Sequence, residues 1–185
     1  MNTPDILSFD TYTNCCLCPR MCRIDRSRTT GFCGCSHCLT AARAALHHWE
    51  EPCISGGGDS GGIPAADGGA PVPGGGIPSP GGSGAVFFSG CTLGCCFCQN
   101  HRISSGHFGR ELTAKELAQV FLRLQDQGAY NINLVTPTQY LPHIISALDQ
   151  VRSRLTIPVV YNCGGYERVE TVKALKDYVD IWLPD

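Results

Sequence analysis

The sequence predicts an α/β protein: a partial (β/α) barrel truncated to about four strands, preceded by a cysteine-rich metal-binding module. Apolar, strand-like runs alternate with amphipathic helices from residue 85 onward, and such alternation requires parallel strands joined by right-handed crossovers. Seven of the 13 cysteines lie between residues 15 and 38, and a stretch rich in glycine and proline follows them. We therefore expect a cysteine-rich module over residues 1–54, a flexible linker over residues 55–84 and the barrel over residues 85–185, with an open doubly wound sheet as the alternative to a barrel.

Each element of the alternating part has its own signal. Strands are predicted from short apolar runs over residues 86–89, 131–136, 157–162 and 179–183. Helices are predicted over residues 113–128, 142–154 and 167–176, the first because Thr113 and Glu116 form a capping box and Gly128 terminates it. The loops that follow the strands of a barrel share one mouth, where active sites lie. We therefore expect residues 91–98, 136–139, 162–165 and 185 around a single cavity.

Two segments of the first half have a distinct composition. The alanines and Leu46 favour a helix over residues 40–49, and the adjacent His47 and His48 are more often structural than metal ligands. Residues 55–84 hold 13 of the 22 glycines and five of the 12 prolines. Such a stretch buries too little apolar surface to offset its ordering entropy, which predicts a flexible linker.

Composition excludes several classes of protein. The net charge is −2, with 14 Lys and Arg against 16 Asp and Glu, so the basic stripe of a nucleic-acid-binding protein is missing. No apolar window reaches membrane-spanning length, and residues 1–10 lack the pattern of a signal peptide. The cysteines stand in metal-ligand spacings rather than a disulfide framework. We expect a cytoplasmic protein in a reducing compartment, without nucleic-acid or membrane partners.

The N-terminal cysteines allow two ligand sets. Cys15, Cys18, Cys35 and Cys38 match a four-cysteine zinc ribbon, whereas Cys15, Cys18, Cys22 and Cys33 form a second possible set. Zinc and an iron–sulfur cluster both take such ligands, so the metal is open as well. Thiols that only pack are the remaining alternative, but seven cysteines in so short a segment exceed ordinary core usage.

A second cysteine group follows the first predicted strand. Cys91, Cys95 and Cys98 form a C-x3-C-x2-C loop, and three thiolates leave one position of a metal site free for water or substrate. An open position indicates chemistry at the metal. A zinc loop or three buried structural thiols is the alternative, and Cys96, Cys53 and Cys163 are expected to be packed thiols.

This loop, with Phe97 just before its last cysteine, resembles the signature of radical S-adenosylmethionine (SAM) enzymes. The resemblance implies that Cys91, Cys95 and Cys98 hold a [4Fe–4S] cluster whose fourth iron binds SAM. One electron, from a reductant such as flavodoxin or ferredoxin, then cleaves SAM to methionine and a 5′-deoxyadenosyl radical that abstracts hydrogen from the substrate.

Longer motifs sharpen the resemblance. The stretches 50–56, 86–91, 97–100, 131–138, 159–162 and 179–185 are together similar to the uncharacterised relatives of pyruvate formate-lyase activating enzymes. The resemblance implies that Phe97 lies beside the nucleoside, that Asn162 and Asp185 face SAM, and that Thr136 and Thr138 replace the usual Gly-Gly-Glu. It also favours the set Cys15, Cys18, Cys22 and Cys33 for the second metal site.

The chain departs from that pattern in length. Such enzymes usually close six strands, but four are predicted here, and the chain stops at Asp185 of what resembles an Asp-x-Lys motif. We expect a C-terminally truncated barrel that by itself binds a cluster poorly and turns over little. Two functional classes stay open: a radical-generating oxidoreductase, such as an activase that installs a glycyl radical on a protein partner, and a non-catalytic iron–sulfur or zinc-binding protein.

Overall fold

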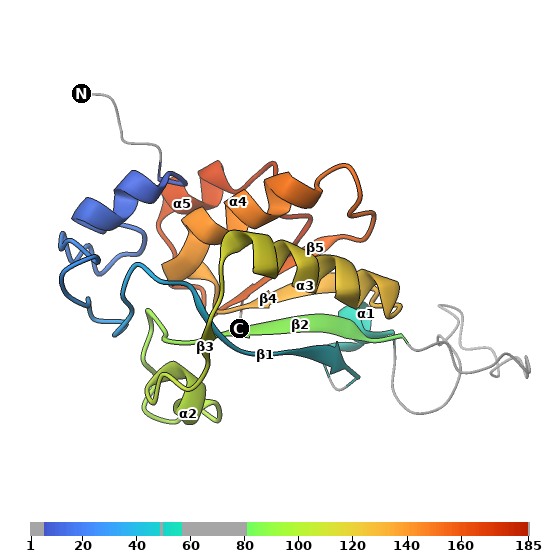
Figure 1. The fold of residues 1–185 in the computed structure, drawn as a ribbon. Coiled ribbons are helices and arrows are strands. Elements are labelled where there is room, and N and C mark those ends of the chain that lie inside the picture. Colours follow the sequence, from blue (N-terminus) through green and yellow to red (C-terminus); the bar gives the residue numbers. More distant parts are fainter. Residues whose placement is uncertain (1–5, 49, 57–80, 185) are drawn as a thin grey trace, which may run out of the picture.

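A mixed six-stranded sheet organises the structure (Figure 1), a computed structural model that describes residues 6–48, 50–56 and 81–184. The strand order is β3-β1-β2-β4-β5-β6. The strands are β1 (Thr40–His47), β2 (Ser83–Phe88), β3 (Arg110–Glu111), β4 (Asn131–Val135), β5 (Val159–Cys163) and β6 (Ile181–Pro184). The helices are η1 (Phe9–Asn14), α1 (Pro52–Ser55), α2 (His101–Ser104), α3 (Ala114–Asp126), η2 (Thr138–Tyr140), α4 (Leu141–Val151) and α5 (Val169–Ala174).

Four strands are parallel, as the alternating pattern predicts. β2 pairs with β4, β4 with β5 and β5 with β6, all in parallel register. The helices α3, α4 and α5 lie together over one face of this part of the sheet (Figure 1). The predicted α/β fold with parallel strands is therefore confirmed, and the observed bounds differ from the predicted ones by three residues or fewer.

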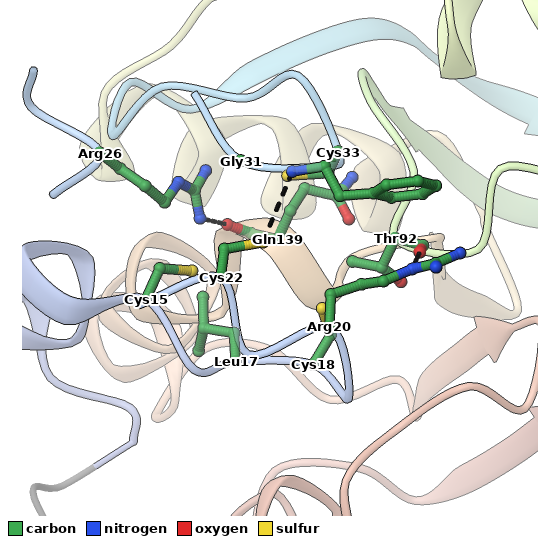
Figure 2. A pocket seen from close by; sticks show the side chains of 11 residues that line it. Cys15, Leu17, Cys18, Arg20, Cys22, Arg26, Gly31, Cys33, Thr92 and Gln139 are labelled. Carbon is green, nitrogen blue, oxygen red and sulfur yellow. Dashed lines mark hydrogen bonds between the residues drawn. The ribbon is translucent and has the colours of Figure 1, made fainter. Parts of the chain in front are cut away.

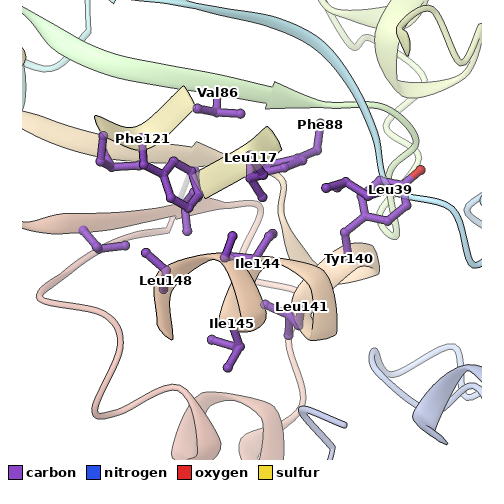
Figure 3. Packing of buried hydrophobic residues seen from close by; sticks show 14 of the residues in the cluster. Leu39, Val86, Phe88, Leu117, Phe121, Tyr140, Leu141, Ile144, Ile145 and Leu148 are labelled. Carbon is purple, nitrogen blue, oxygen red and sulfur yellow. The ribbon is translucent and has the colours of Figure 1, made fainter. Parts of the chain in front are cut away.

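Helix α3 begins at the predicted capping box. The backbone N–H of Glu116 donates to the Thr113 hydroxyl at 3.2 Å, and the Glu116 carboxylate accepts from the Thr113 N–H at 2.8 Å. Leu117 and Phe121, one turn apart on the helix, are fully buried in the core between the helices and the sheet (Figure 3). Capping and an apolar stripe together determine where this helix starts and which face it buries.

The helix predicted over residues 40–49 is wrong, because residues 40–47 form strand β1. This strand pairs with β2 in antiparallel register, with Ala41 opposite Phe88 and Ala45 opposite Ala85. Alanine has a high helix propensity, but backbone pairing with a distant strand overrides a weak local preference. The pairing adds two antiparallel strands, β1 and β3, to the four predicted ones.

The predicted linker starts too early and ends too late. Helix α1 includes Ser55, and β2 begins at Ser83, whose hydroxyl donates to the Asn131 side chain at 2.8 Å. Gly84 lies so close to β4 that an added Cβ would stand 2.6 Å from the Asn131 carbonyl oxygen. A glycine of the presumed linker is thus required by strand packing. Residues 57–80 of the predicted linker lie outside the described residues.

The N-terminal segment, residues 6–39, packs at the carboxyl ends of the parallel strands. Its Tyr12, Leu17 and Leu39 belong to the same buried core as the helices. The Thr171 hydroxyl of α5 donates to the Leu17 carbonyl at 2.9 Å, and the Tyr12 hydroxyl is 2.9 Å from His143 Nδ1 of α4. This segment therefore covers the edge of the sheet at which the predicted site residues lie.

We expect His143 to make stability pH-dependent. Burial, and less strongly the charge of Arg26, lowers the pKa of His143 from 6.5 to about 4. Between these pH values the unfolded chain binds a proton that the folded chain does not, so stability present above pH 6.5 is lost as the pH falls towards 4.

The expected loss is about 2 kcal/mol, allowing for partial exposure of the ring. Urea unfolding of the unmodified protein and of His143→Gln across this pH window measures it. Parallel pH profiles of the two proteins would contradict the assignment, because every other titrating group is common to both.

Candidate functional site

The loop that carries Cys91, Cys95 and Cys98 begins directly after β2. Gly90 turns the chain with φ +78°, and its N–H donates to the Ile103 carbonyl at 3.0 Å. The Cys98 N–H donates to the Cys95 carbonyl at 3.3 Å, and the following residues form α2. The loop is therefore a closed turn at the carboxyl end of a parallel strand, as the sequence predicts.

The three thiols of this loop are free and partly exposed. The Ser104 hydroxyl donates to the Cys98 sulfur at 3.4 Å. Cys96 is exposed and Phe97 is 85% exposed. Buried structural thiols are the alternative, but these thiols are partly exposed. Their exposure favours a role as cofactor ligands.

No group of three metal-binding side chains in the described residues converges on the position of one ion.

The N-terminal segment contacts the loop that carries Cys91, Cys95 and Cys98 and supports its backbone. The Arg20 guanidinium donates to the carbonyls of Thr92 and Leu93 at 3.2 and 3.1 Å, and it stacks on the Phe32 ring at 3.6 Å. Gly94, with φ +72°, lies against the same ring, which an added Cβ would approach to 3.2 Å. Arg20 and Phe32 therefore hold the turn between Cys91 and Cys95.

Thr136, the residue after β4, has an unusual backbone conformation. Its φ is +49°, a left-handed value that is rare for a β-branched residue. Its N–H donates to the Asn162 carbonyl of β5 at 2.8 Å. Such strain is found at functional sites more often than elsewhere. The structure thus brings predicted site residues from two strands into contact.

Gln139 lies in the range 136–139 that the sequence places at the cavity, but its role was not predicted. Its side-chain Nε2 donates to the carbonyls of Ser89, Gly90 and Thr136 at 3.1, 3.0 and 2.8 Å. One buried amide therefore ties the end of β2, where the cysteine loop starts, to the end of β4. The only signal in the sequence is a glutamine just after a strand end, which predicts no such contact.

The other predicted site residues divide between the two faces of the sheet. The Thr138 hydroxyl is buried, 2.9 Å from the Tyr161 hydroxyl, and donates to Glu167 at 2.8 Å. Asn162 is half-buried, and because neighbouring Tyr161 and Cys163 belong to the core, its side chain points away from the helices. Asp185 lies outside the described residues.

The face of the sheet away from the helices contains an unpaired amide. Asn133 is fully buried, yet neither polar atom of its side chain has a hydrogen-bond partner in the described structure. Ile132 and Leu134 face the helices, so Asn133 lies on the same face as Asn162. An unpaired buried amide is destabilising by about 1–3 kcal/mol, which points to a ligand on this face.

Four N-terminal cysteines line a single pocket (Figure 2): Cys15, Cys18, Cys22 and Cys33. Burial raises the pKa of Cys15 and Cys18, whereas a hydrogen bond from Cys35 lowers the pKa of Cys33 to about 6. Cys35 and Cys38 do not line this pocket. Of the two ligand sets that the sequence leaves open, the structure brings together the second.

Gln139→Ala is expected to lower the free energy of unfolding by about 2 kcal/mol, because three carbonyls lose a buried donor. Urea denaturation of the purified protein measures the change. Gln150→Ala is the matched control: Gln150 is exposed on α4 and donates only to Ser146, one turn away at 3.0 Å. Equal effects of the two substitutions would show that Gln139 does not hold the strand ends together.

In the described part of the chain, no helix is long and apolar enough to cross a membrane.

Comparisons with known proteins place the chain in a family. The family model of the radical SAM superfamily matches residues 85–184. An uncharacterized protein of Methanocaldococcus jannaschii is 29% identical over 183 residues, which cover 94% of this chain and 45% of that protein. The chain thus spans less than half the length of this relative. No solved structure matches this chain. The family model covers more than half of the 185 residues, and the chain therefore belongs to the radical SAM superfamily.

Proposed function

We propose that Cys91, Cys95 and Cys98 bind a [4Fe–4S] cluster with which the protein cleaves SAM. The observation that supports this most is the position of three free thiols in a C-x3-C-x2-C loop at the start of a matched radical SAM domain. When bound, the cluster supplies one electron to SAM, which yields methionine and a 5′-deoxyadenosyl radical.

The residues of this chain would hold and orient these groups. The Ser104 hydroxyl stabilises the Cys98 thiolate by a hydrogen bond. Gln139 and Arg20 fix the backbone on both sides of Cys91, so the three sulfurs keep their spacing. The exposed ring of Phe97 is available to pack against the adenine of SAM.

The polar residues at the strand ends are the proposed contacts to SAM. Thr136 and Asn162 are joined by a backbone hydrogen bond of 2.8 Å. The unpaired Asn133 on the same face as Asn162 provides a further donor and acceptor. Asp185 and Thr138 are proposed from the resemblance alone, and the Thr138 hydroxyl already has two protein partners.

The resemblance to activating enzymes extends the proposal to partners. A flavodoxin or ferredoxin would deliver the electron, and a glycyl-radical enzyme would be the protein substrate, which makes the activity that of an oxidoreductase. A non-catalytic iron–sulfur or zinc-binding protein is the second candidate, because four cysteines that line one pocket are also the ligand set of a structural metal site.

Anaerobic reconstitution with iron and sulfide, followed by dithionite and SAM, tests the proposal. We expect 5′-deoxyadenosine to form and each of the substitutions Cys91→Ala, Cys95→Ala and Cys98→Ala to abolish it. A reconstituted cluster that gives no 5′-deoxyadenosine would contradict the proposal. Stoichiometric zinc without any nucleoside product would favour the second candidate.

A further inference from the structure

We propose that Cys15, Cys18, Cys22 and Cys33 bind a second iron–sulfur cluster, which braces the cysteine loop of the first. These four residues precede the part of the chain that the radical SAM model matches, residues 85–184. The inference does not require SAM cleavage, but the iron content expected below rests on the cluster that the proposed function assigns to the loop of Cys91, Cys95 and Cys98.

The pocket is built around sulfur. All four thiols are free and line it together (Figure 2). The Phe32 N–H donates to the Cys22 sulfur at 3.5 Å, the kind of hydrogen bond that stabilises a metal-bound thiolate. Gly31 lies against the same sulfur, which an added Cβ would approach to 3.1 Å. The backbone thus wraps closely around Cys22.

A buried positive charge lines the pocket and favours negatively charged ligands in it. Arg26 lines it and is only 1% exposed. Its hydrogen bonds go to the carbonyls of Cys35, Ser36 and Gln139, and no carboxylate in the described residues forms a salt bridge with it. The carbonyls satisfy the N–H donors of the guanidinium, but they do not neutralise its positive charge. Four cysteine thiolates on a cluster would supply the missing negative charge, which uncharged packed thiols cannot do.

The alternative zinc-ribbon set is not assembled. The buried Cys35 sulfur donates to the carbonyls of Cys33 and Ser89 at 3.3 and 3.5 Å. The Cys38 sulfur lies 3.7 Å from His37 Nε2. Neither residue lines the pocket that Cys15 and Cys18 share with Cys22 and Cys33.

A cluster and a single zinc ion would both take four thiolate ligands. Acid-labile sulfide distinguishes them, because a cluster contains it and a zinc site does not.

The second site touches the first through two side chains. Arg20 lines the pocket and donates to Thr92 and Leu93 in the loop. Phe32 lines the pocket as well and packs on Gly94. A cluster that orders residues 15–33 would thereby hold the loop, so we expect its loss to weaken the first site without removing it.

Metal analysis of the reconstituted protein tests this inference. We expect Cys22→Ala to reduce iron and acid-labile sulfide per chain to about half of the unmodified value, because one of two four-iron clusters is lost. Cys38→Ala is the matched control, since the ribbon set needs Cys38 and the pocket does not, and it should keep the full iron content. Circular dichroism confirms that each variant folds.

A second measurement does not depend on the loop. The triple variant Cys91→Ala/Cys95→Ala/Cys98→Ala should keep about half of the iron and a cluster absorbance, and adding Cys22→Ala should remove both. The inference is overturned by unchanged iron in Cys22→Ala, by equal iron loss in Cys38→Ala, or by zinc or no metal in the triple variant. Each of these three results would overturn the second cluster without contradicting the function proposed for the loop of Cys91, Cys95 and Cys98.

Discussion

Cys95→Ala is expected to abolish the cluster of the C-x3-C-x2-C loop, whereas Cys96→Ala should leave it intact. Cys95 is one of the three proposed ligands, so its loss would leave two thiolates, too few to hold a four-iron cluster. Cys96 is adjacent and exposed but stands outside the spacing. Iron and sulfide per chain, together with 5′-deoxyadenosine formation, measure the effect.

The comparison between the two neighbouring cysteines separates ligation from general damage to the loop. Both substitutions remove a sulfur from the same turn, between Gly94 and Phe97. If both variants lost the same amount of iron, the spacing would not define the site. If neither lost any, the iron of the unmodified protein would all belong elsewhere, for example to the pocket of Cys15, Cys18, Cys22 and Cys33.

Arg26→Met is expected to lower the free energy of unfolding by about 3 kcal/mol. Arg26 donates to the carbonyls of Cys35 and Gln139 at 3.2 and 2.6 Å and stands 4.5 Å from the centre of the Tyr12 ring. Methionine keeps the apolar volume of the side chain but leaves these buried carbonyls without donors. The N-terminal segment would then detach more easily from η2.

Arg28→Met is the matched control for Arg26→Met. The Arg28 side chain is 84% exposed and forms a 3.3 Å salt bridge with Asp25 on the surface, so its loss should change stability by less than about 1 kcal/mol. Urea denaturation of both variants, prepared with the same metal content, gives the comparison. Similar midpoints for the two would mean that Arg26 does not join the N-terminal segment to the sheet.

Local sequence signals were sufficient for the parallel half of the fold. The capping box of Thr113 and Glu116, for example, depends on residues three apart, and it forms as predicted. Strand β1 could not be predicted in this way, because its stability comes from pairing with β2, whose first residue, Ser83, lies opposite His47. The alanines of β1 are compatible with either structure, so a distant partner decides between them.

In the candidate site, too, local features could be predicted from the sequence and long-range contacts could not. Spacing alone singled out Cys91, Cys95 and Cys98, because ligands on one short loop are close in sequence as well as in space. The two N-terminal sets share Cys15 and Cys18, and the choice between them depends on Cys35 turning to the Ser89 carbonyl, 54 residues away. The roles of Gln139 and Arg26 are likewise invisible until the chain is folded.

The electron paramagnetic resonance spectrum of the dithionite-reduced Cys22→Ala protein, recorded with and without SAM, tests the central claim most directly. In this variant the loop of Cys91, Cys95 and Cys98 is left as the expected cluster site. If the fourth iron of that cluster binds SAM, the spectrum changes when SAM is added. A reduced-cluster spectrum that stays the same at saturating SAM would contradict the account.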